Sequence, residues 1–146
     1  MQILRSEQQV ALQQLHVLAQ ESVDHYQDSA EFVDNEVATQ LFKHIAAERL
    51  QLVQKLAQAI RDTGDLPAAP DADREAGEQL IHRLHAWFTT DQSRDVLEQR
   101  LKAEQDLAQT LRDKRNATSD DIYQTLYDNF VTQVDNTTQS LRQAIS

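Results

Sequence analysis

The 146-residue sequence contains no cysteine, which excludes disulfides, thiolate catalysis and cysteine-based zinc or iron–sulfur sites. It has only two glycines and two prolines, and no segment in which Val, Ile and Thr alternate with polar residues. Neither a β-sheet nor a glycine-rich phosphate loop is therefore expected. No run approaches the roughly 18 apolar residues of a membrane span, and the N-terminus lacks the apolar stretch of a signal peptide. We expect a cytoplasmic protein with no membrane partner.

Basic residues are also scarce. The chain has 14 Lys and Arg against 24 Asp and Glu, which gives a net charge of -10. Nucleic acids and anionic membrane surfaces are bound through clusters of Lys and Arg, which this balance does not supply. Both classes of partner are therefore excluded from our expectation.

The residues that dominate are Gln, Ala, Leu, Glu and Asp, which favour an all-α protein, and the length suits a single domain over residues 1–146. Apolar residues recur at steps of three and four, which predicts long helices from residue 3 or 6 to 33, over 35–64, over 93–114 and over 121–144. Asp34 or Asn35 is the expected N-cap of the second helix and Thr118 that of the last, and Gly64 suits the end of the second helix. The inward face of the first helix is predicted to be Leu12, Leu15, Ala19, Ser22, Tyr26, Ala30 and Val33. That of the second is predicted to be Val37, Leu41, Ile45, Leu52, Leu56 and Ala59. The last helix shows a stripe of Tyr123, Tyr127, Phe130, Val134, Thr137 and Leu141, with Ile122, Leu126 and Val131 beside it.

The links near residues 34 and 116 are short, so each joins two antiparallel helices. The connection over residues 64–93 is long, holds both prolines, and includes a shorter predicted helix over 74–88 anchored by Trp87. It is long enough to return along the bundle and to make the third long helix parallel to the second. The architecture expected is a ferritin-like four-helix bundle with a crossover connection that carries a short extra helix. The alternative is a plain array of five helices.

Two predicted inward stripes contain a glutamate. Glu48 lies between Ile45 and Leu52 in the second long helix, and Glu104 lies in a stripe of the third. If the first two helices turn at residues 34–35, residues equally far from the turn lie at the same height along the bundle. Glu21 then lies at the height of Glu48, and His25 at that of His44. The same reasoning places Glu104, and Asp128 or Asn129 of the last helix, at this height. The sequence thus predicts a cluster that could hold iron or manganese, formed by Glu21, His25, His44, Glu48 and Glu104.

The pattern for such a metal centre is incomplete. Di-iron carboxylate bundles use a Glu-x-x-His motif on two helices, and this motif does not occur in the sequence. The last helix has no glutamate, only Asp128 and Asp135. The alternative is therefore that Glu48 and Glu104 are polar core residues whose partner is Tyr26, Arg49, Arg100 or buried water. His82 and His85, one turn apart, form at most a weak second pair of ligands.

Several segments together resemble a known family: YQDSAEF, LFKHIAAERLQLVQKL, IHRLHAWF and LEQRLKAEQDLAQTL. The chain is similar over nearly its whole length to small bacterial ferritin-like four-helix-bundle proteins that are catalogued as a domain of unknown function. The residues that carry the likeness best are Tyr26 with Ala30, Arg49, His82 and Arg83 before Trp87, and Glu104. The resemblance implies a ferritin-like topology and no defined activity. Where the family usually has a second acid one turn before Glu104, this chain has Leu101.

Two functions follow as hypotheses. The first is a non-enzymatic helical bundle with a structural or interaction role and a degenerate metal site, which forms a homodimer through an exposed helical face. The second is a carboxylate bundle that binds iron or manganese at the five residues above and carries out oxidase or storage chemistry. Under the first hypothesis no cofactor is expected.

Overall fold

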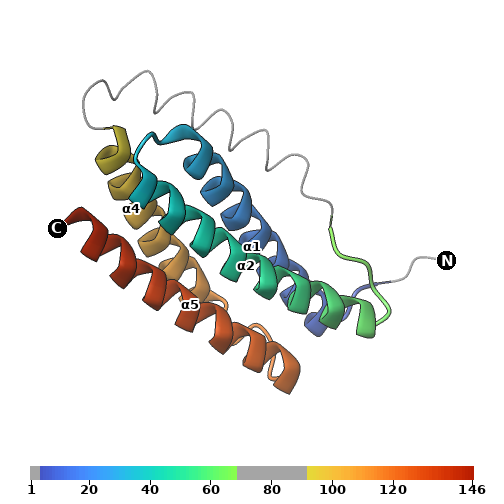
Figure 1. The fold of residues 1–146 in the computed structure, drawn as a ribbon. Helices are drawn as coiled ribbons and strands as arrows, with labels where there is room; N and C mark the ends of the chain where they lie inside the picture. Colours follow the sequence, from blue (N-terminus) through green and yellow to red (C-terminus); the bar gives the residue numbers. More distant parts are fainter. Residues whose placement is uncertain (1–3, 69–91) are drawn as a thin grey trace.

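The computed structural model describes residues 4–68 and 92–146 (Figure 1). The regular structure in these ranges is entirely helical and comprises α1 (Glu7–Phe32), α2 (Glu36–Asp62), α4 (Gln92–Asp113) and α5 (Asp121–Ile145). The predicted helix over residues 74–88, with His82, His85 and Trp87, lies outside the described residues. Within those two ranges, no helix combines the length and the apolar character needed to cross a membrane.

The four helices lie side by side in a bundle (Figure 1). Helix α1 packs antiparallel to α2, and α4 packs antiparallel to α5. Helix α4 runs in the same direction as α2, which is the direction expected from the long connection between them (Figure 1). Helix α2 also contacts α5, so the two hairpins share one interior.

Polar side chains at the helix ends explain where each helix begins. Ser6 caps α1 in a reciprocal capping box with Gln9, and the Asn35 side chain accepts a hydrogen bond from the backbone N of Ala38 at the start of α2. The prediction of Thr118 as the cap of α5 is wrong. Asp120 caps that helix by accepting from the N of Tyr123 at 2.9 Å, while the Thr118 hydroxyl accepts from the N of Asp120. Gly64 ends the α2 turn with a φ of 87°, a conformation that favours glycine.

The predicted inward stripes of α1 and α5 are confirmed, because each of their residues is buried, whereas Ile122, predicted beside the α5 stripe, is 53% exposed. The predicted face of α2 is partly wrong: Val37 is 75% exposed, whereas Phe42 and Ile60 are fully buried. The core falls into two apolar clusters. The first is centred on Leu15, Leu56, Ile60, Tyr127 and Phe130, and the second on Tyr26, Phe42, Ile45, Val96 and Leu141.

Asp65 ties the N-terminal segment to the end of α2. Its carboxylate accepts hydrogen bonds from Arg5 Nε at 2.7 Å and from Gln13 Nε2 at 3.1 Å. These two hydrogen bonds, with one from the backbone of Leu66, lower the pKa of Asp65 from 3.8 to about 2. The charged carboxylate therefore stabilises the folded state.

We predict that Asp65→Asn lowers the free energy of unfolding at pH 7. Because the folded-state pKa lies below the unfolded one, this contribution is complete above pH 3.8 and is lost as the pH falls towards about 2. Urea unfolding followed by circular dichroism at neutral pH, and then at acidic pH values across that window, measures the difference between the two proteins. Asp62→Asn, an exposed change nearby, is the control. A difference that is equal at every pH would contradict the assignment.

Candidate functional site

A layer of polar residues separates the two apolar clusters at the middle of the bundle. Each described helix contributes one member: Ser22 from α1, Arg49 from α2, Glu104 from α4 and Thr137 from α5. All four are at least nine-tenths buried, with Arg49 at 1% exposure and Glu104 at 2%. Because charged residues are rarely buried in this way unless they are paired, the layer is the most unusual feature of the core.

Arg49 lies at the centre of this layer and bonds to each of the other three helices. Its Nη1 and Nη2 donate to the two carboxylate oxygens of Glu104, each at 3.2 Å. Nη1 also donates to Ser22 Oγ at 2.8 Å, and Nη2 to Thr137 Oγ1 at 3.1 Å. The Tyr26 hydroxyl donates to Glu104 Oε1 at 2.8 Å. The buried carboxylate thus receives three hydrogen bonds, two of them in the parallel geometry that suits an arginine–carboxylate pair.

Aromatic rings enclose the two buried guanidinium groups. The Arg49 guanidinium lies 5.6 Å from the centre of the Phe130 ring and 6.0 Å from that of Tyr26. Arg100, 4% exposed, lies 5.7 Å from the Tyr26 ring. Burial, and next the charge of Glu104, raise the pKa of Tyr26 well above its ordinary value, so the phenol stays a hydrogen-bond donor. The Tyr26 phenol therefore keeps its proton and donates it in a hydrogen bond to the Glu104 carboxylate.

The inward placement of Glu48 is wrong. Its carboxylate pairs with His44 Nε2 at 2.6 Å on the outer surface, where the two side chains are 46% and 69% exposed. Residues 48 and 49 both satisfy the spacing between Ile45 and Leu52. The helix turns Arg49 inward because Phe42 and Leu56, seven residues to either side of it, are fully buried. The alternative prediction that Arg49 and Tyr26 are partners of Glu104 is confirmed.

Of the five residues predicted as metal ligands, the structure brings three to one pocket. Glu21, His25 and Glu104 line a cavity of about 240 Å³ between α1 and α4, while His44 and Glu48 lie on the surface. Across residues 4–68 and 92–146, no three His, Asp or Glu side chains are grouped so that they could hold a metal ion. The residues described here thus do not fit the metal centre that the ferritin-like resemblance implies, because Arg49 already binds both oxygens of Glu104.

The expected contribution of α5 to this level is also corrected. Asp128 and Asn129 are exposed, and the ring next to the guanidinium belongs to Phe130, one residue further on. The α5 residue that hydrogen-bonds to Arg49 is Thr137, which the sequence placed on the inward face without a polar partner. The predicted height is therefore several residues too early along α5, because Arg49 lies between Phe130 and Thr137, and Gln133 Nε2 donates to the backbone oxygen of Glu48.

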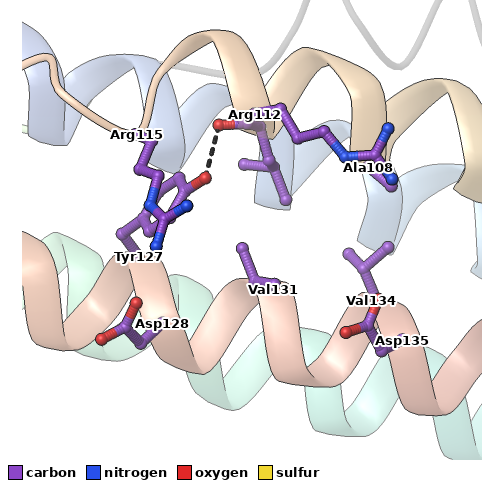
Figure 2. Close-up of a pocket in the computed structure, with 9 residues that line it drawn as sticks. Ala108, Arg112, Arg115, Tyr127, Asp128, Val131, Val134 and Asp135 are labelled. Carbon is purple, nitrogen blue, oxygen red and sulfur yellow. Dashed lines mark hydrogen bonds between the residues drawn. The ribbon is translucent and has the colours of Figure 1, made fainter.

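A second concave feature lies between α4 and α5 (Figure 2). This groove of about 470 Å³ has an apolar floor that includes Leu111, Val131 and Val134. Arg112 and Arg115 lie along one side, and Asp128 and Asp135 along the other (Figure 2). The Tyr127 hydroxyl donates to the backbone oxygen of Leu111 at 2.8 Å, which fixes the ring at one end. The groove has oppositely charged sides but no nucleophile paired with a base.

Comparisons of this chain with protein-family models, with curated proteins and with solved structures found no match.

We predict that Arg49→Met lowers the free energy of unfolding by about 3–5 kcal/mol, because it leaves the Glu104 carboxylate buried without its cation. The double variant Arg49→Met, Glu104→Leu should recover most of that loss, since it removes both charges from the core. Urea unfolding of the single and double variants at pH 7 measures the coupling between the two side chains.

Glu48→Gln is the matched control, because it changes the adjacent acid on the same helix. It should alter the free energy of unfolding by less than about 1 kcal/mol, the usual worth of an exposed ion pair. A larger effect for Glu48→Gln than for Arg49→Met would mean that the helix is turned the other way.

Proposed function

We propose that this protein is a ferritin-like four-helix bundle without enzymatic activity, which serves a structural or interaction role. In this proposal the crossover topology is kept, and an arginine takes the central place that a metal ion has in carboxylate bundles. One observation carries it: both oxygens of the single buried glutamate in the described core are bonded by Arg49.

The chemistry of the donor set supports this reading. A metal ligand must offer a free lone pair, and a guanidinium at 3.2 Å from each carboxylate oxygen competes for those lone pairs with its fixed positive charge. A cation added beside Arg49 would also experience repulsion that a buried site does not screen well. The bundle can be stable without metal, because the ion pair already neutralises the buried carboxylate.

We predict that the purified protein, mixed anaerobically with ferrous or manganous ion and desalted, retains fewer than about one ion per ten chains. Elemental analysis measures the metal, and Glu104→Gln should give the same value as the unchanged protein. Stoichiometric binding that is lost in Glu104→Gln would contradict the proposal and favour the iron or manganese bundle. Binding that survives in Glu104→Gln would place a metal away from the core layer.

The proposal includes a homodimer formed through the face between α2 and α5. This face holds a shallow groove of about 500 Å³ that is lined in part by Ala59, Ile122 and Leu126. Ile122 is 53% exposed, which is high for a large apolar residue within a helix. Lys55 borders the groove on α2 and Asp121 on α5. A twofold axis through the groove would place Lys55 of each copy against the acids of the other, since Asp62 and Asp121 line the same groove.

Sedimentation velocity is expected to give a species of twice the 16.7 kDa chain mass. Ile122→Asp should weaken the dimer at least about tenfold, because a buried charge would replace an apolar contact. Val37→Asp is the control, since Val37 is also exposed but lies at the opposite end of α2. A monomer at all concentrations, or equal weakening by both changes, would contradict this interface.

A further inference from the structure

The groove between α4 and α5 has two positive and two negative side chains on opposite sides (Figure 2). Arg112 and Arg115 line one side, and Asp128 and Asp135 line the other. Within residues 4–68 and 92–146, the ion pairs are formed by other side chains, so these four charges are not paired across the groove. Opposite charges that are held apart in this way can be bridged by a ligand that carries both signs.

Three of the four charges lie around the phenol of Tyr127. Burial raises the pKa of Tyr127, and the charges of Arg115, Asp128 and Arg112 also act on it. The hydroxyl donates to the backbone oxygen of Leu111, which holds the ring in place at this end of the groove (Figure 2). A ligand headgroup bound here would therefore meet both signs of charge beside a fixed ring.

The charged groups are accessible to a ligand. All four side chains are exposed. Arg112 uses Nη1 in a hydrogen bond to Gln109 at 2.9 Å, and a guanidinium has four further N–H groups with which to bind an acceptor. A carboxylate is the acceptor that suits it best, because the two can form parallel hydrogen bonds.

The floor of the groove is apolar and the groove is large enough for more than a single ion. Leu111 and Val134 are each 1% exposed, and Ala108 and Val131 are half-buried beside them. The volume of about 470 Å³ is roughly that of sixteen water molecules in the liquid. A ligand with a similar number of non-hydrogen atoms could place an apolar body on this floor.

The balance of charge favours a zwitterion over a simple ion. The chain has a net charge of -10, which repels a free anion, and the two arginines of the groove repel a free cation. A zwitterion has no net charge, and its two ends match the two sides of the groove.

We propose that this groove binds an apolar zwitterion of the amino-acid or short-peptide class. Its carboxylate pairs with Arg115 and Arg112, its ammonium group pairs with Asp128, and its side chains lie on the apolar floor. Asp135 lies seven residues after Asp128, about 10 Å further along α5, and can pair with the ammonium group of a longer peptide. This ligand site goes beyond the structural or interaction role proposed above, and it requires neither the dimer nor the absence of metal.

Leucylleucine is the probe, and leucine is the single-residue arm of the experiment. Titration followed by ¹H–¹⁵N NMR should show binding of leucylleucine with a Kd of about 1 mM, because the charged contacts are exposed and the apolar floor is short. N-acetyl-leucylleucine lacks the ammonium group and leucylleucinamide lacks the carboxylate. Each should bind about fivefold more weakly, which is the upper end of what an exposed ion pair contributes. Tighter binding of leucine would assign the site to free amino acids, and tighter binding of leucylleucine to peptides.

Arg115→Gln and Asp128→Asn should each weaken the binding of leucylleucine about fivefold. Arg142→Gln and Asp113→Asn are the matched controls, because they alter the net charge by the same amounts at exposed positions that do not line the groove. Both controls should leave binding unchanged. The site would be overturned if neither leucine nor leucylleucine binds, if the two blocked peptides bind as well as leucylleucine, or if the controls weaken binding equally.

Discussion

The contact between Arg49 and Glu104 is the constraint on which the rest of the bundle depends. One guanidinium on α2 bonds to side chains of α1, α4 and α5, so it fixes the relative height of all four described helices. A shift of one helix by one residue would leave a buried charge without its partner, which is strongly destabilising. The apolar clusters on either side supply most of the burial, and the polar layer selects one alignment of them.

In this layer the buried glutamate has a structural role, whereas in carboxylate bundles a core glutamate has a structural role and is also a metal ligand. A glutamate in the core of such a bundle serves both as a structural residue and as a ligand, because the metal supplies the compensating charge. Here the compensating charge is part of the chain, and Tyr26 and Arg49 use the carboxylate oxygens that a metal would need. Within the described bundle, the buried carboxylate is therefore neutralised by a side chain of the same protein.

The helices and most of the core could be predicted from the sequence, because long stripes of apolar residues define their inward faces. All six residues expected on the inner face of α5 are buried. The rotation of α2 was misjudged by one position, since Glu48 and Arg49 both fit the spacing between Ile45 and Leu52. Lys55, exposed and seven residues after Glu48, marks the outer face, while Leu56 lies seven residues after Arg49 and is fully buried. This heptad relation is present in the sequence and distinguishes the two residues.

What the sequence could not provide is the pairing of charges across helices. Arg49 and Arg100 both have a buried side chain near Tyr26, yet within the described residues the hydrogen bonds to the Glu104 carboxylate come from Arg49 and not from Arg100. The difference arises because Arg100 and Glu104 belong to the same helix, and Glu104 is held by bonds directed across the bundle from α2 and α1. A search of the sequence for metal ligands considers acids and histidines, because these side chains bind cations. It therefore passes over Arg49, the cation at the centre of the described core that pairs with Glu104.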